Sequence, residues 1–176
     1  MGIIALAIKR SGPGPVLFVQ ERLGRDGRPF DFYKFRSMVA DAADKRPDLD
    51  ALNETDGALF KMEDDPRITR VGRIIRRFSV DELPQLWNVI RGEMSLVGPR
   101  PERPEMIAAI ERDVAGYARR HELPPGLTGL TQINGRYDTD ADYKLGYDLQ
   151  YLVNWSVVLD AQILVRTVWV VLSRRV

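Results

Sequence analysis

The chain has 176 residues, of which 44% are hydrophobic and 29% are charged, a composition typical of a folded globular protein with one domain. Its formal net charge is only +1, so any preference for a charged partner must come from how the charges are distributed. The absence of Cys and the single His exclude a disulfide framework and a thiolate nucleophile, and argue against serine-hydrolase and zinc chemistry. Carboxylate chemistry remains, together with a cation such as Mg²⁺ that prefers oxygen ligands.

The chain begins with an apolar segment, residues 2–8, which is followed directly by Lys9 and Arg10. This segment is too short for a signal peptide, and no run of about 18 apolar residues predicts a transmembrane helix. Two interpretations fit the segment equally well. It is either an element packed on the core or the end of a helix that contacts a membrane.

A β-hairpin is predicted next, with strands at residues 16–22 and 29–35 and an Asp-Gly turn within residues 24–27. Side chains alternate along a strand, so Lys34 and Arg36 are expected on one face together with two Phe residues. That face either directs the two cations toward a site or forms a solvated strand edge.

Residues 38–45 have a helical pattern, and residues 46–65 are acidic and turn-rich, which predicts a loop. Residues 66–77 follow as an amphipathic helix whose charged face is entirely cationic. Its cations are Arg67, Arg70, Arg73, Arg76 and Arg77. This face is a solvated surface, a site for anionic lipid or substrate phosphate, or a nucleic-acid surface. The absence of interleaved aromatic residues makes nucleic acid the least favoured interpretation.

Downstream, residues 98–101 read Gly-Pro-Arg-Pro and predict a rigid turn that presents Arg100 at a fixed position. A helix is expected over residues 104–121, with His121 at the surface. Residues 124–136 are rich in turns and glycine. Residues 142–175 again have a helical pattern, and their Trp residues suit either a membrane interface or core packing.

Asp81 and Glu82 stand at the start of an apolar helical pattern. The spacing from Ser79 to Glu82 fits a capping box, and the positive end of a helix dipole favours both carboxylates. Pro84 complicates this structural explanation unless the helix begins after it. The same arrangement would keep a carboxylate ionised and exposed as a nucleophile, because helix amides and nearby arginines lower its pKa.

Neighbouring side chains on a helix project in directions about 100° apart, so this pair is unsuited to straddling a sugar ring as a glycosidase pair does. The two carboxylates can instead divide the work at a phosphoryl centre, one attacking phosphorus and the other holding Mg²⁺. An anionic nucleophile approaching a phosphate needs cations to offset the repulsion. The candidates for that role are Lys34, Arg36, Arg76 and Arg100.

A series of sequence blocks resembles, in order, the signature blocks of the bacterial sugar transferases, the monotopic polyprenyl-phosphate phosphoglycosyl transferases. The blocks are residues 14–18, 20–22, 34–38, 65–67, 81–88, 94–102 and 126–136. Single blocks are weak signals, but this ordered set is specific and the resemblance covers nearly the whole chain.

The resemblance implies an enzyme that transfers a sugar 1-phosphate from a UDP-sugar to polyprenyl (undecaprenyl) phosphate and releases UMP. The site would be at the cytoplasmic face of the bacterial inner membrane, at the first membrane step of polysaccharide or glycoprotein glycan assembly. Asp81 would carry a covalent phosphosugar, and Glu82 with Asp81 would bind Mg²⁺. The implied phosphate- or nucleotide-binding residues are Lys34, Arg36, Arg76, Pro99, Arg100, Pro101 and Gln132.

The fold expected from the pattern and the resemblance is α+β. It is a helix-dominated single domain over residues 1–176 with a small β-hairpin and amphipathic membrane-surface helices. Family members usually begin with a re-entrant membrane helix, which we expect to be missing or truncated here. The alternative function is a non-catalytic scaffold of a glycan assembly complex that binds anionic lipid or nucleotide. No nucleic-acid partner is expected, and the sequence leaves the sugar, the pathway and the oligomeric state open.

Overall fold

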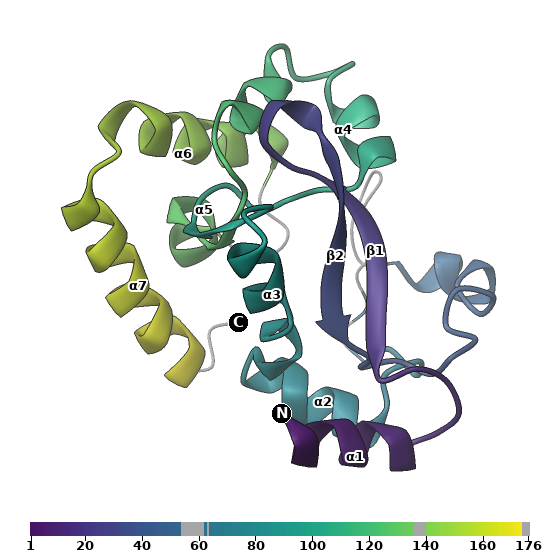
Figure 1. Cartoon of the computed structure of the whole chain (residues 1–176). Helices are drawn as coiled ribbons and strands as arrows, with labels where there is room; N and C mark the ends of the chain where they lie inside the picture. Colours follow the sequence, from purple (N-terminus) through teal and green to yellow (C-terminus); the bar gives the residue numbers. More distant parts are fainter. Residues whose placement is uncertain (54–61, 63, 136–139, 174–176) are drawn as a thin grey trace. The chain divides into compact units, whose positions relative to one another are not determined.

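The structure is a computed structural model that describes residues 1–53, 62, 64–135 and 140–173 (Figure 1). Its α-helices are α1 (Gly2–Arg10), α2 (Arg70–Arg77), α3 (Gln85–Ile90), α4 (Pro104–Ile110), α5 (Leu130–Asn134), α6 (Ala141–Asn154) and α7 (Val157–Leu172). Its strands are β1 (Leu17–Leu23), β2 (Pro29–Phe35), β3 (Ser95–Val97) and β4 (Gly126–Thr128). The 3₁₀ helices among the described residues are η1 (Arg25–Gly27), η2 (Pro47–Leu52), η3 (Val80–Glu82) and η4 (Tyr117–Glu122). Helices dominate and the two sheets are small, which confirms the predicted α+β class.

The described residues group into two compact units. The first unit contains Met1–Phe18 and Lys34–Pro84, and the second contains Val19–Tyr33 and Gln85–Val176. Each unit has hydrophobic clustering of its own. The single domain over residues 1–176 stays a prediction.

The core of the first unit joins α1, α2 and the end of β2. Ile8, Phe35 and Ile75 are buried together there, and Ile8 is fully inaccessible to solvent. The N-terminal segment is therefore a helix with one face in the core, while Ile3 and Leu6 of the same helix are exposed. The buried face fits the interpretation as an element packed on the core. The exposed apolar face fits the interpretation as the end of a membrane-contacting helix.

Helix α2 confirms the predicted cationic amphipathic helix, although it is shorter than residues 66–77. It starts at Arg70 because the Thr69 side chain accepts a hydrogen bond from Gly72 N, a typical N-cap contact. Gly72 lies against the backbone of Ser37, where an added Cβ would stand 1.8 Å from the carbonyl oxygen. Helix α2 can therefore pack directly on the chain that follows β2.

The predicted hairpin is confirmed by β1 and β2, which pair with each other. At its tip Asp26 and Gly27 both have positive φ, at 58° and 71°, and Arg28 N donates to Arg25 O. Asp and Gly tolerate this left-handed conformation, which matches the twist of the two strands.

The helix predicted for residues 38–45 is wrong. Met38 instead forms an isolated antiparallel bridge with Ile68, and Val39 N donates to Arg67 O. The backbone groups that would open a helix are used in this long-range pairing, so turns follow. Of the acidic loop, residues 54–61 and 63 lie outside the described part of the chain.

The second unit has two hydrophobic clusters linked by α6. Leu145 of α6 is buried beside Ile107 and Tyr117, and Tyr151 is buried beside Ile163 of α7. Asn88 of α3 is fully buried as well, and its side-chain amide donates to the carbonyl of Asp31 in β2 at 2.6 Å. Buried polar side chains require such partners, so Asn88 fixes α3 to the hairpin within this unit.

The helical pattern predicted for residues 142–175 is divided into α6 and α7. The break falls at Trp155 and Ser156, and the Ser156 hydroxyl caps α7 by accepting from Leu159 N. Trp155 and Trp169 are 57% and 70% exposed, so core packing does not account for the two Trp residues. Arg174 and Arg175 lie outside the described residues.

The helix predicted for residues 104–121 is shorter in the structure, where α4 ends at Ile110. Gly116 adopts φ 78°, and the 3₁₀ helix η4 follows it.

Within the part of the chain that the structure describes, every helix is too short or too polar to cross a membrane.

His121 lies in η4 and is half-buried, whereas the sequence predicted a surface position. Burial lowers the pKa of His121, Arg120 acts in the same direction, and Glu111 opposes them. The unfolded chain therefore binds a proton more readily than the folded chain does below the ordinary His pKa of about 6.5.

We expect His121 to destabilise the protein as the pH falls from about 7.5 to about 5.5, the range in which the unfolded state takes up the proton. Urea unfolding at both pH values should show a larger loss of stability for the wild type than for His121→Asn. Equal losses in the two proteins would contradict this expectation.

Candidate active site

The two acidic residues of the predicted reactive centre lie in the first unit, in the 3₁₀ turn η3. Ser79, which precedes it, adopts a left-handed conformation with φ 52° and makes no side-chain cap hydrogen bond. The predicted capping box is therefore wrong. The helix that follows, α3, begins at Gln85 directly after Pro84, as the missing N–H of proline requires.

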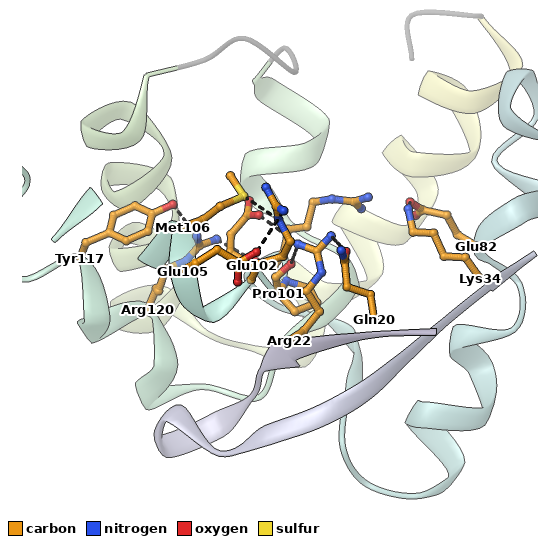
Figure 2. A network of polar contacts seen from close by, with 12 residues as sticks. Gln20, Arg22, Lys34, Glu82, Pro101, Glu102, Glu105, Met106, Tyr117 and Arg120 are labelled. Atoms are coloured by element: carbon orange, nitrogen blue, oxygen red, sulfur yellow. Dashed lines mark hydrogen bonds and ion pairs between the residues drawn. The ribbon is translucent and has the colours of Figure 1, made fainter. Parts of the chain in front are cut away.

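Lys34 and Glu82 are brought together as an ion pair. Lys34 Nζ donates to Glu82 Oε1 at 2.7 Å, with 21% and 18% of the two side chains exposed (Figure 2). The pair joins the end of β2 to η3 within one unit. Of the two interpretations of this strand face, this contact favours the one in which Lys34 is directed toward a site, and the role of Lys34 in binding phosphate stays a prediction.

Asp81 is buried, with 7% of its surface exposed, so the expectation of an exposed carboxylate is wrong. The reason is the tight 3₁₀ turn, which carries Asp81 inward and leaves Glu82 half-buried. Charges shielded from water interact more strongly, because the local dielectric constant is lower than that of bulk solvent. An enclosed Asp81 is thus more responsive to a nearby cation than a solvated one.

Arg36 is buried and directs its guanidinium to backbone carbonyls of the N-terminal segment. It donates to Ile8 O at 2.9 Å, to Gly12 O at 2.8 Å and to Pro13 O. These contacts fix the loop after α1 and satisfy a carbonyl at the end of that helix. Its binding of phosphate stays a prediction.

Arg76 is half-buried near the end of α2, and its Nε donates to Ser37 Oγ at 2.8 Å. Its positive charge also helps to hold the pKa of Asp65 below the usual value, after the larger effect of the hydrogen bond from Arg67. Arg70, Arg73 and Arg77 on the same helix are exposed, as expected for a cationic face.

Mg²⁺ prefers oxygen ligands, which the carboxylates of this chain can provide. Among the described residues no three side chains of His, Cys, Asp or Glu gather in one place. Protein-bound Mg²⁺ commonly takes only one or two carboxylates and completes its shell with water and substrate phosphate oxygens. The adjacent carboxylates of Asp81 and Glu82 fit that requirement.

The predicted Pro99–Arg100–Pro101 turn lies in the second unit, after β3. Strands β3 and β4 pair in parallel, and Gly98 N donates to Thr128 O at 2.9 Å. A Cβ at Gly98 would stand 2.4 Å from the carbonyl oxygen of Pro124. Only glycine allows this approach, which brings the turn against residues 124–129.

Gln132 lies in α5 and belongs to the same unit as Arg100. Both of its side-chain amide atoms are buried, and neither has a hydrogen-bond partner among the described residues. A Cβ at Gly129 would approach Gln132 Oε1 to 2.6 Å and Gly98 O to 2.1 Å. Gln132 is therefore close to the glycine contact that supports the turn, and its amide retains hydrogen-bonding capacity.

Sequence reasoning missed several buried polar residues around this turn. Arg120 and Asp148 form an ion pair of 2.9 Å with both side chains 2% exposed, and Arg22 pairs with Glu102 at 3.2 Å. Burial lowers the pKa of Lys144, and Glu102, Arg120, Arg100 and Asp148 all act on it electrostatically. No local signal separates buried Arg120 from exposed Arg119 in the sequence.

The family of the chain follows from its similarity to known proteins. The model of the bacterial sugar transferase family matches residues 1–174. The chain belongs to that family, as the ordered sequence blocks indicated.

Several curated relatives share more than 40% identity with the chain. The galactosyl transferase CpsE of Streptococcus agalactiae is 47% identical over 97% of this chain, which covers 38% of that relative. The undecaprenyl-phosphate glucose phosphotransferase of Komagataeibacter xylinus is 45% identical, covering 94% of this chain and 31% of the relative. An Escherichia coli relative named UDP-glucose:undecaprenyl-phosphate glucose-1-phosphate transferase is 43% identical, covering 94% and 34%. The chain thus spans about a third of the length of these relatives.

We expect Gly98→Ala to destabilise the protein by about 2 kcal/mol or more, because the added methyl group would collide with backbone atoms that cannot move aside. Gly146→Ala is the matched control, since a Cβ there meets nothing within 4 Å and α6 gains a better helix former. Urea unfolding checks both variants. A Gly98→Ala protein as stable as the wild type would show that the close approach is not required.

Proposed function

We propose that the protein transfers a sugar 1-phosphate from a UDP-sugar to undecaprenyl phosphate, giving undecaprenyl-diphosphate-sugar and UMP. The observation that carries the proposal is the match, over nearly the whole chain, to relatives named for this activity. The ion pair between Lys34 and Glu82 supports it, because it brings a cation from β2 to the turn η3, which carries both predicted carboxylates.

In the proposed first step, an Asp81 carboxylate oxygen attacks the β-phosphorus of the UDP-sugar. The bond between this phosphorus and the bridging oxygen breaks, and UMP leaves with the electron pair. The sugar phosphate is then an acyl phosphate on Asp81. In the second step a phosphate oxygen of undecaprenyl phosphate attacks the same phosphorus, and the Asp81 carboxylate is released unchanged.

The positive side chains near the acidic pair reduce the repulsion between Asp81 and the donor diphosphate. Lys34 compensates the charge of Glu82, and Arg76 adds positive charge in the same unit. In the second unit, Arg100 is proposed to bind a phosphate of the donor, within the turn formed with Pro99 and Pro101. Arg36 and Gln132 are proposed as further binding residues on the strength of their motifs.

Asp81 and Glu82 are proposed to hold Mg²⁺, which when bound would neutralise charge on the donor diphosphate. Under this proposal Glu82 and Asp81 have different roles. Glu82 accepts from Lys34 and stays oriented, and the buried position of Asp81 keeps its carboxylate away from competing water.

One substrate of the proposed reaction is a lipid phosphate, so we place the protein at the cytoplasmic face of the bacterial inner membrane. The exposed face of α7 supports this placement because it is unusually apolar for a surface helix. Its exposed apolar residues are Val157, Val158, Leu164, Val165, Val168, Trp169 and Leu172. A helix of this kind can lie in a membrane interface without crossing it.

A non-catalytic scaffold that binds anionic lipid or nucleotide is the second candidate function. The exposed arginines of α2 favour it, since guanidinium groups bind phosphate oxygens in two-point contacts. This candidate predicts binding to anionic vesicles that weakens with added salt and yields no UMP.

We expect Asp81→Asn to lower UMP release by a factor of about 10⁴ or more, because the amide is not a nucleophile. UMP is measured with UDP-glucose, UDP-galactose and UDP-N-acetylgalactosamine, each with undecaprenyl phosphate. Radiolabelled sugar should remain on the wild-type protein and be absent from the variant.

Asp113→Asn is the matched control, because Asp113 is exposed and lies in the turn after α4. Its turnover should equal that of the wild type. Unchanged turnover in Asp81→Asn would reject Asp81 as the nucleophile. Failure of the wild type to release UMP, together with salt-sensitive vesicle binding, would favour the scaffold.

A further inference from the structure

The turn that carries Arg100 is held by hydrogen bonds to four consecutive backbone carbonyls. Pro99 O accepts from Gly126 N at 2.8 Å, and Glu102 O accepts from Leu23 N at 3.0 Å. Of the two carbonyls between them, Arg100 O accepts from Arg120 and Pro101 O accepts from Arg22. Prolines at 99 and 101 provide no N–H, so the turn has few hydrogen bonds of its own to close it.

Arg22 holds the turn from the hairpin side. Its NH1 donates to Pro101 O at 3.2 Å and to the Glu102 carboxylate at 3.2 Å, while its NH2 donates to Gln20 (Figure 2). The guanidinium also lies 5.3 Å from the centre of the Phe32 ring. Arg22 is therefore fixed by its own strand and its neighbour before it reaches the turn.

Arg120, which lies in η4, holds the turn from a second side. Its NH2 donates to Arg100 O at 2.9 Å and pairs with Asp148 at 2.9 Å, and its NH1 donates to the Tyr117 hydroxyl. Thr131 Oγ1 donates to the other oxygen of Asp148 at 2.6 Å. Burial raises the pKa of Tyr117 to about 12, so its hydroxyl stays protonated at neutral pH.

The geometry of both contacts requires arginine. Each guanidinium serves at least three acceptors in different directions, which a planar group with five N–H donors can do. A lysine has one nitrogen on a flexible stem and would have to abandon some of them. Because Arg120 and Asp148 are buried, their positions are set by their partners and not by solvent.

We infer that Arg22 and Arg120 are positioning residues that fix the Pro99–Glu102 backbone and thereby the direction of Arg100. The inference rests on the proposed function, in which Arg100 binds a phosphate of the UDP-sugar. Neither residue needs to touch the substrate. Each acts through one carbonyl next to the Arg100 side chain, at residues 100 and 101.

The test is a set of lysine variants assayed with the UDP-sugar that gives the fastest UMP release. Arg22→Lys and Arg120→Lys should each raise the KM for the UDP-sugar by about tenfold and change kcat less, the pattern of weakened donor binding. Arg25→Lys and Arg119→Lys are the controls, because both arginines are exposed; Arg25 lies in η1 directly after β1, and Arg119 precedes Arg120 in η4. Their kinetics should match the wild type.

A double-mutant cycle separates positioning from a general structural role. In an Arg100→Ala background, Arg22→Lys should give no further rise in KM, since the group that it positions is gone. A further tenfold rise in that background would overturn the inference. If Arg120→Lys does not fold, Tyr117→Phe serves in its place, because it removes one partner of the guanidinium and leaves the charge pair.

Hydrogen exchange of the Gly126 and Leu23 amides, which donate to Pro99 O and Glu102 O, gives a readout that does not depend on turnover. Exchange should be faster in Arg22→Lys than in the wild type and unchanged in Arg25→Lys. If the wild type releases no UMP, the proposed function fails, and hydrogen exchange alone then decides whether Arg22 fixes the Pro99–Glu102 backbone. Unchanged exchange together with unchanged KM would overturn the positioning role while leaving a turnover that depends on Asp81 intact.

Discussion

The close approach of two backbones at Gly98 is the constraint on which the second unit depends. Gly98, Gly126 and Gly129 meet where side chains cannot fit, and this contact allows β3 and β4 to pair. The pairing sets where the Pro99–Glu102 turn leaves the sheet, and the turn in turn sets the position of Arg100. A sheet of two short strands is only marginally stable by itself, so the arginine contacts to the turn add to its stability.

Several arginines hydrogen-bond to backbone carbonyls of the chain itself. Arg22, Arg36, Arg67 and Arg120 each donate to a backbone carbonyl that belongs to an irregular segment or a helix end. In a chain with small sheets and short helices, many carbonyls lack ladder partners, and guanidinium groups satisfy them. Arginine content alone therefore overstates how many cations are available for phosphate.

The sequence predicted what local chemistry decides. The Asp26-Gly27 turn, the cationic amphipathic helix (without its start after Thr69) and the helix start after Pro84 each depend on a few adjacent residues. It failed where partners far along the chain decided. Residues 38–39 pair with residues 67–68 instead of forming a helix, and Asp81 is turned inward. Of the candidate site, strand alternation indicated that Lys34 could face a site but not that it pairs with Glu82. Arg120 carried no signal, because only the tertiary fold separates it from Arg119.

The left-handed backbone at Ser79 has a consequence for how the reactive turn tolerates change over evolution. A residue other than glycine at φ 52° costs about 1 kcal/mol, and β-branched side chains fit this conformation worst. Selection for thermal resistance alone would favour glycine or asparagine at this position. A serine that persists there would mean that something other than stability maintains it. The backbone just before the two carboxylates would then keep a strained conformation.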